Sequence, residues 1–160
     1  MSKSISSYMV IFNLYDSTRD RKEYYAVDTT SIHKIRPLES ITRVPNTLPC
    51  IVGITNYRGK VIPVINMKTL LEFPNTEIRD SRLLIAEIKG KLLGLLVDGI
   101  EQVSEISLED MDVTSSILDN SPYLRGVVKQ DDKLVLVIDI ERLISSAIGV
   151  KDDDAEQREC

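Results

Sequence analysis

The feature that most restricts the fold is an internal repeat. Gly53–Leu71 runs as a glycine turn, an apolar strand and a short helix, and Gly126–Ile144 follows the same order. The offset from Gly53 to Gly126 equals the offset from Lys60 to Lys133. A chain of 160 residues with such a repeat is expected to form two copies of one small fold.

Each copy reads as short strands separated by turns. Alternating or β-branched segments bounded by polar, Gly or Pro residues predict strands at 8–14, 23–27, 32–36 and 41–44, and again at 82–88, 92–97 and 100–103. Residues 104–122 are polar and predict a long loop with a helical turn near Ser107–Asp110. This pattern is typical of small antiparallel barrels, not of a βαβ sheet, so the predicted class is all-β.

The repeated strands are apolar without alternation. Val61–Ile65 and Leu134–Ile138 contain no charged residue, which predicts burial on both faces. Asn66 and Asp139 follow these strands and can each cap a short helix, over Met67–Leu71 and Ile140–Ile148.

Composition excludes several classes of function. A net charge of −5 and a pI near 5.0 argue against nucleic acid as the main partner. The sequence contains no run of about 18 apolar residues, so we expect neither a transmembrane helix nor direct membrane insertion. The start lacks an apolar leader, so a cytoplasmic location is expected. Residues 149–160 are acidic and polar and are expected to be a disordered tail.

Catalytic and metal-binding patterns are missing from the sequence. His33 is the single histidine, so neither a triad nor a histidine-rich metal site has enough ligands. No glycine segment fits a phosphate loop, and no serine sits in a nucleophile elbow. We therefore expect a protein that is not an enzyme and that binds no cofactor or metal. The alternative that stays open is an enzyme whose unrecognised active site uses Cys50.

Two motifs resemble those of the CheW family. Gly53-Ile-Thr-Asn56-Tyr-Arg58-Gly59-Lys-Val-Ile-Pro63-Val-Ile-Asn66 is similar to that family's G-x-x-N-L-R-G-x-x-x-P-x-x-D. Gly94-Leu-Leu-Val97-Asp98-Gly99-Ile100-Glu-Gln-Val103 is similar to its G-x-x-V-D-x-V-x-x-V. The resemblance runs from about Tyr8 to Ile144. Tyr57 replaces the usual Leu, and Lys34 stands where Glu is common.

The resemblance implies a fold of two five-stranded SH3-like barrels within a CheW-like domain at 8–148. The first barrel is expected mostly within 15–80, and the second mostly within 81–148 together with strand 8–14. It also implies a non-catalytic adaptor, monomeric in isolation, that is recruited to membrane-associated arrays. There it would couple the cytoplasmic tips of methyl-accepting chemoreceptors to the regulatory domain of the histidine kinase CheA. Because Lys34 and Tyr57 depart from the family motif, the alternative stays open that the chain is a CheW-like paralogue serving pilus motility or gene regulation.

Site residues follow by position from the resemblance. The receptor-binding set would be Asn56, Arg58, Gly59, Ile100 and Val103, with Asn56 fixing the turn and Gly59 permitting a positive φ. The kinase-binding set would be Thr29, Ile32, Lys34 and Gly53. The Arg58 guanidinium could hold a carboxylate bidentately, or it could brace its own turn. Ile32, Ile100 and Val103 could instead be core residues.

Overall fold

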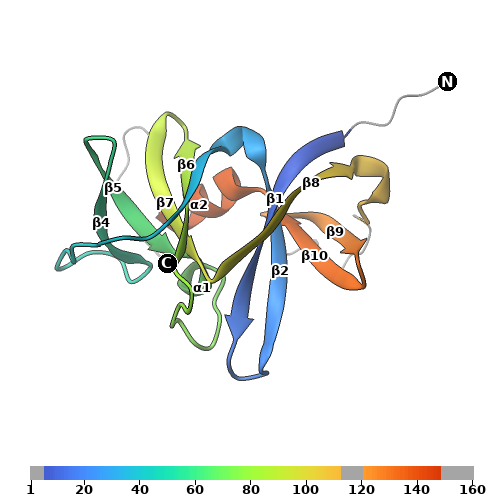
Figure 1. Ribbon diagram of the computed structural model, residues 1–160, viewed down its shortest axis with the longest axis horizontal. Coiled ribbons are helices and arrows are strands. Elements are labelled where there is room, and N and C mark those ends of the chain that lie inside the picture. The colour runs from blue at the N-terminus through green and yellow to red at the C-terminus, as the bar shows by residue number, and fades with distance from the viewer. Residues whose placement is uncertain (1–5, 113–120, 149–160) are drawn as a thin grey trace.

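The computed structural model describes residues 6–112 and 121–148, and these form two five-stranded sheets (Figure 1). Sheet A has the order β8-β1-β2-β10-β9, with bounds β1 Ser6–Asp16, β2 Arg21–Asp28, β8 Gly99–Ser107, β9 Leu124–Gln130 and β10 Lys133–Ile138. Sheet B has the order β3-β6-β7-β5-β4, with bounds β3 Ile32–Pro37, β4 Ile51–Tyr57, β5 Lys60–Asn66, β6 Arg82–Ile88 and β7 Lys91–Val97.

Short helices join these strands. Two 3₁₀ turns, η1 and η2, follow β2 and β8, and two α-helices follow β5 and β10; their bounds are η1 Thr29–Ser31, η2 Leu108–Asp110, α1 Met67–Leu70 and α2 Ile140–Ile148. The cap predicted at Asn66 is confirmed, because its side chain accepts hydrogen bonds from the backbone of Lys68 and Thr69. Asp139 plays the same part at α2 by accepting from the Arg142 N–H.

The predicted duplication is confirmed, and the two copies exchange strands. Both sheets contain one parallel pair, β2 with β10 and β5 with β7, at equivalent places in the strand order. The hairpin β1–β2 belongs to the first copy in sequence, yet it pairs with β8 and β10 of the second. The hairpin β6–β7 conversely pairs with β3 and β5.

The sheets therefore divide the chain differently from the expected ranges 15–80 and 81–148. The segment Arg21–Asp28 lies in sheet A together with β1, whereas Arg82–Val97 lies in sheet B. Hairpins keep their two strands together, so exchanging β1 moves β2 with it.

Two local expectations are corrected. Residues 41–44 do not form a strand, and only the single bridge from Thr42 to Ile54 is present there. The loop expected from 104 onward begins later, because β8 continues to Ser107 alongside the equally extended start of β1. The long β1–β8 pairing supplies backbone partners that residues 104–107 would otherwise lack.

The largest apolar cluster is shared by both sheets. Alternate residues of β1, Val10, Phe12 and Leu14, pack in it with Leu84 of β6, while Met9 and Ile11 face a separate cluster within sheet A. Helix α2 adds Ile140 and Ile144 and lies between the sheets in the view of Figure 1. This shared core joins the two sheets through apolar burial.

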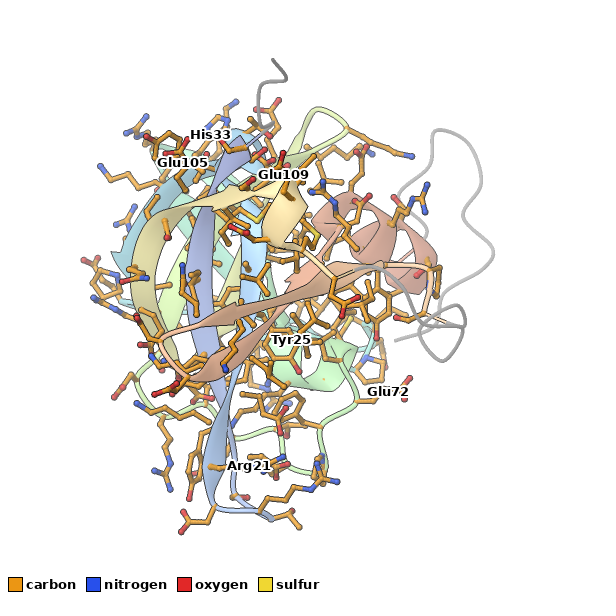
Figure 2. The ribbon with its side chains drawn as sticks, turned by 90° about the vertical axis from the view of Figure 1, so that its right-hand side faces the viewer. Arg21, Tyr25, His33, Glu72, Glu105 and Glu109 are labelled. Carbon is orange, nitrogen blue, oxygen red and sulfur yellow. The ribbon has the colours of Figure 1, made fainter. Side chains whose placement is uncertain are left out.

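Aromatic packing extends the same core. The Tyr25 ring stacks on Phe12 with centroids 5.7 Å apart, and Figure 2 places Tyr25 toward the middle of the molecule. Burial raises the pKa of the Tyr25 phenol above its ordinary value.

Burial of the two repeated strands differs from the prediction at their first apolar residues. Ile62, Val64 and Ile65 are buried as expected, but Val61 and its repeat counterpart Leu134 are each 66% exposed. Each lies on the opposite face of its strand from the buried residue that follows it, so the first half of each strand is buried on one face only.

Candidate functional site

The first motif forms the tight turn between β4 and β5. Tyr57 pairs with Lys60, which leaves Arg58 and Gly59 as a two-residue loop with φ of 52° and 81°. Positive φ at both positions is the type I′ geometry that suits the twist of a hairpin. The Asn56 Oδ1 accepts the Gly59 N–H at 3.2 Å. The predicted turn roles of Asn56 and Gly59 are thus confirmed.

Arg58 is exposed at the tip of this turn. Its guanidinium carbon lies 5.2 Å from the centroid of the Tyr57 ring, and that ring is buried. In the described part of the chain no carboxylate lies within ion-pairing distance of Arg58. The ring positions the side chain by a cation–π contact and leaves its N–H donors available to another molecule.

A small cavity of about 260 Å³ opens beside the turn. Arg36 and Ser40 border it from the end of β3 and the segment beyond, Thr55 and Arg58 border it from β4 and the turn, and Ile85 lies at its apolar side. The Thr55 hydroxyl donates to the Ser40 carbonyl at 2.8 Å, which joins the two walls. The segment that follows β3 is thus attached to β4, and the cavity lies between them.

A second guanidinium faces the same ring. Arg36 lies 5.7 Å from the Tyr57 centroid, on the cavity wall opposite the turn. Its ion-pair partner is Glu39, at 3.8 Å, and the Glu39 side chain is 72% exposed. The cavity thus combines two cationic groups with one weakly held carboxylate.

The remaining predicted receptor residues lie elsewhere. Ile100 and Val103 belong to β8, an edge strand of the other sheet, and Figure 1 shows β8 well separated from the β4–β5 hairpin. Ile100 packs against the shared core, whereas Val103 is 53% exposed. The structure brings Asn56, Arg58 and Gly59 together and leaves Ile100 and Val103 as a separate position.

The predicted kinase residues are spread over η1 and the edges of sheet B. Thr29 starts η1, where Asp28 caps the turn. Ile32 is half-buried and packs against the shared core, while Lys34 is exposed on the edge strand β3. Gly53 is buried on β4, and a Cβ there would stand 2.3 Å from the Thr42 carbonyl oxygen. Only Gly fits this close backbone approach, so Gly53 shapes the sheet edge.

These elements match a known family. The model of the CheW-like domain matches residues 10–147. The chain belongs to the CheW-like domain family. The chemotaxis protein CheW of Thermotoga maritima is 30% identical over 127 residues, which cover 79% of this chain and 83% of that protein. The CheW proteins of Bacillus subtilis and Klebsiella aerogenes are 30% and 27% identical, over 75% and 78% of this chain and 79% and 76% of theirs.

A solved structure has the same fold. The scaffolding protein TtCheW from Thermoanaerobacter tengcongensis superposes with a TM-score of 0.75 and is 31% identical, covering 88% of this chain and 93% of that one. The CheW-like assignment made from the two motifs is thereby confirmed.

The second CheW-like motif contributes Asp98 to a buried ion pair that the sequence did not predict. Asp98 links β7 of sheet B to β8 of sheet A, and its Oδ2 lies 3.0 Å from the Lys68 Nζ of α1. Both side chains are almost completely buried. Lys68 also donates to the Glu77 carbonyl at 2.7 Å, and Asp98 accepts the Tyr15 N–H at 2.7 Å. The pair joins both sheets and the segment between α1 and β6.

Three other properties bear on function. Cys50 is fully buried in the shared core, out of reach of a substrate. Within residues 6–112 and 121–148, no cluster of His, Cys, Asp or Glu is arranged to hold a metal ion. No helix in those ranges has the length and apolar character needed to cross a membrane.

Proposed function

We propose that this CheW-like chain is a non-catalytic adaptor in chemotaxis that couples chemoreceptors to the histidine kinase CheA. The proposal is supported by the family, by relatives named as chemotaxis proteins and by a structural neighbour described as a scaffold. The observation that carries it is Arg58, presented at the tip of a hydrogen-bonded turn beside the Tyr57 ring, with no carboxylate partner in the described chain.

The receptor's cytoplasmic tip would bind at the β4–β5 turn. Arg58 would supply charged, planar hydrogen-bond donors, and Asn56 and Gly59 would fix the turn that presents them. Ile100 and Val103 would form a second, apolar contact on β8, which only a receptor segment long enough to cross from sheet B to sheet A could reach simultaneously.

The CheA regulatory domain would bind the edge of sheet B. Lys34 is exposed there, and Ile32 presents part of its side chain beside it. Thr29 would extend this contact through η1, and Gly53 would act by shaping the opposite edge strand. An edge strand has unpaired backbone groups as well as side chains to offer a partner.

This adaptor would act as a cytoplasmic monomer recruited to receptor arrays. The relatives reported above carry chemotaxis names, which favours this pathway over pilus motility or gene regulation.

Two binding measurements test the function. Purified chain is titrated with the CheA regulatory domain and, separately, with a receptor signalling-tip fragment. We expect dissociation constants on the order of tens of micromolar or tighter for both. Arg58→Ala should weaken receptor binding and spare CheA binding, and Lys34→Glu should change CheA binding and spare the receptor. Failure of the unmodified chain to bind either partner would overturn the proposal.

A further inference from the structure

Sheet B is basic although the protein is acidic. The whole chain has 20 Lys and Arg against 25 Asp and Glu, whereas residues 32–97, which contain all of sheet B, have more basic than acidic residues. The residues outside 32–97 are correspondingly more acidic than the net charge of the whole chain suggests. They include Glu105 and Glu109, which Figure 2 shows on the sheet A side.

The positive charge is concentrated at one end of sheet B. Arg58 lies in the β4–β5 turn and Lys60 follows the turn; Lys89 and Lys91 occupy the same two positions at the β6–β7 turn. Strand β5 runs parallel to β7, and Figure 1 shows both turns at the same end of the sheet. We call these four residues the basic end; Arg36 lies apart from it, beside Leu83 near the start of β6, and its side chain reaches the Tyr57 ring from β3.

The four turn cations are unneutralised. All are exposed, and within the described ranges none has a carboxylate in ion-pairing distance. By contrast, the lysine of the equivalent hairpin in sheet A, Lys133, lies 3.4 Å from Glu101. Four like charges left unpaired on neighbouring turns repel one another and attract a compact anion.

The cavity beside Tyr57 is a defined site next to this end at which one acidic side chain could bind. Its volume of about 260 Å³ suits one side chain and is below the usual size of a cofactor pocket. Arg36 and Arg58 both lie within 6 Å of the Tyr57 ring centroid, so an anion between them would meet two forked donors. The exposed Glu39 already places a carboxylate 3.8 Å from Arg36, in an ion pair weak enough to be displaced.

We propose that the basic end binds an acidic protein segment and that one Asp or Glu side chain of this segment enters the cavity between Arg36 and Arg58. Lys60, Lys89 and Lys91 attract the flanking carboxylates and set the approach direction. This inference rests on the proposed function in one respect: both use Arg58 as a contact residue. It adds the chemistry of the partner that binds at the β4–β5 turn. It assigns Arg36 as a second anchor and Glu39 as an internal competitor.

The charge distribution favours a short acidic segment over an extended polyanion. Nucleic acid longer than the basic end would continue onto a surface that repels it, because the rest of the protein is acidic. The acidic stretch of a protein segment can instead be as short as the basic end, so that no negative charge extends onto the acidic surface.

The test is a ¹⁵N NMR titration of the full chain with an acetylated and amidated tetraglutamate peptide, using the corresponding tetraglutamine peptide as the neutral control. We expect shifts at the amides of Ser40, Thr55 and Arg58 and at the side-chain Nε–H of Arg36 and Arg58. Arg36→Gln should weaken peptide binding about tenfold, as loss of one charge-assisted contact predicts. Glu39→Gln should strengthen it about threefold by removing the competitor.

Two further variants separate steering from docking. The double variant with Lys89→Gln and Lys91→Gln should weaken binding at low salt and lose most of that difference in about 0.5 M NaCl. Lys22→Gln, at an exposed lysine of β2, is the matched control and should leave binding unchanged.

Three results would overturn the inference: equal binding of the two peptides, shifts confined to β8, or an unchanged affinity in Arg36→Gln. Stronger binding at the same amides by a short DNA duplex, or by vesicles rich in phosphatidylserine, would also refute it in favour of those ligands. Any of these outcomes, with receptor-tip binding intact, would leave the coupling function standing.

Discussion

Replacing the buried Lys68 tests how the two sheets are held together. In Lys68→Met the apolar stem is retained while the ammonium is lost, so Asp98 stays buried without its cation. Removing one partner of a buried ion pair destabilises a protein by about 3–5 kcal/mol. A loss within this range is expected, since Lys68 is inaccessible to solvent and also donates to the Glu77 carbonyl. The backbone N–H groups of Tyr15 and Arg79 would still bind Asp98 and offset part of the loss.

Urea unfolding followed by far-UV circular dichroism measures this loss, because the chain has no Trp to report by fluorescence. For a chain of this size each 1 kcal/mol moves the melting temperature by roughly 2–4 °C, so the melting temperature should fall by about 6–20 °C. Lys89→Met, at an exposed lysine without an ion pair in the described chain, is the control and should stay within about 0.5 kcal/mol of the unmodified chain.

A double variant separates the ion pair from simple packing. Lys68→Met combined with Asp98→Asn should be more stable than the sum of the single losses predicts, by about 0.5–3 kcal/mol. A loss below about 1 kcal/mol in Lys68→Met, or strictly additive losses in the double variant, would refute the assignment of this pair as a stabilising link between the sheets.

Further predictions concern the turns and the motif. Gly59→Ala should lower stability by about 1 kcal/mol, because an Ala side chain disfavours a φ of 81°, and unchanged urea unfolding would contradict this. Asp132→Gly, at the equivalent turn position with φ of 66°, should raise stability by about 0.5–1 kcal/mol in the same assay; a decrease would show that the Asp side chain supports the turn. Gly53→Ala should destabilise by about 1–3 kcal/mol as its methyl group pushes against the Thr42 carbonyl, and a native melting temperature would exclude that clash. Arg58→Ala should change stability by less than about 0.5 kcal/mol, since the side chain is exposed; global unfolding would instead assign Arg58 to bracing its own turn.

Local rules predicted the local features of the fold. Asn66 was identified as a cap and Gly59 as a positive-φ residue because each signal depends on only a few neighbouring residues. The repeat predicted two equivalent units for the same reason, since it is visible in the order of residues alone.

Features set by distant segments were missed. The β1–β2 hairpin lies in sheet A because it pairs with β8 and β10, which come much later in the sequence. A lysine beside a helix cap is usually a surface residue, so nothing near Lys68 indicated its burial against Asp98. The separation of Val103 from Arg58 likewise follows from the sheet to which β8 belongs.

The strand exchange between the copies has a consequence for how this chain can be divided. A fragment ending near residue 80 would keep the hairpin of sheet A and three strands of sheet B, with neither sheet complete. Its counterpart would hold the missing strands of both. Neither half is therefore an autonomous folding unit. During synthesis the strands of the first half cannot complete their sheets until the strands of the second half have been made. Two such fragments mixed together, each unfolded alone, have the complementary edges needed to reconstitute one molecule.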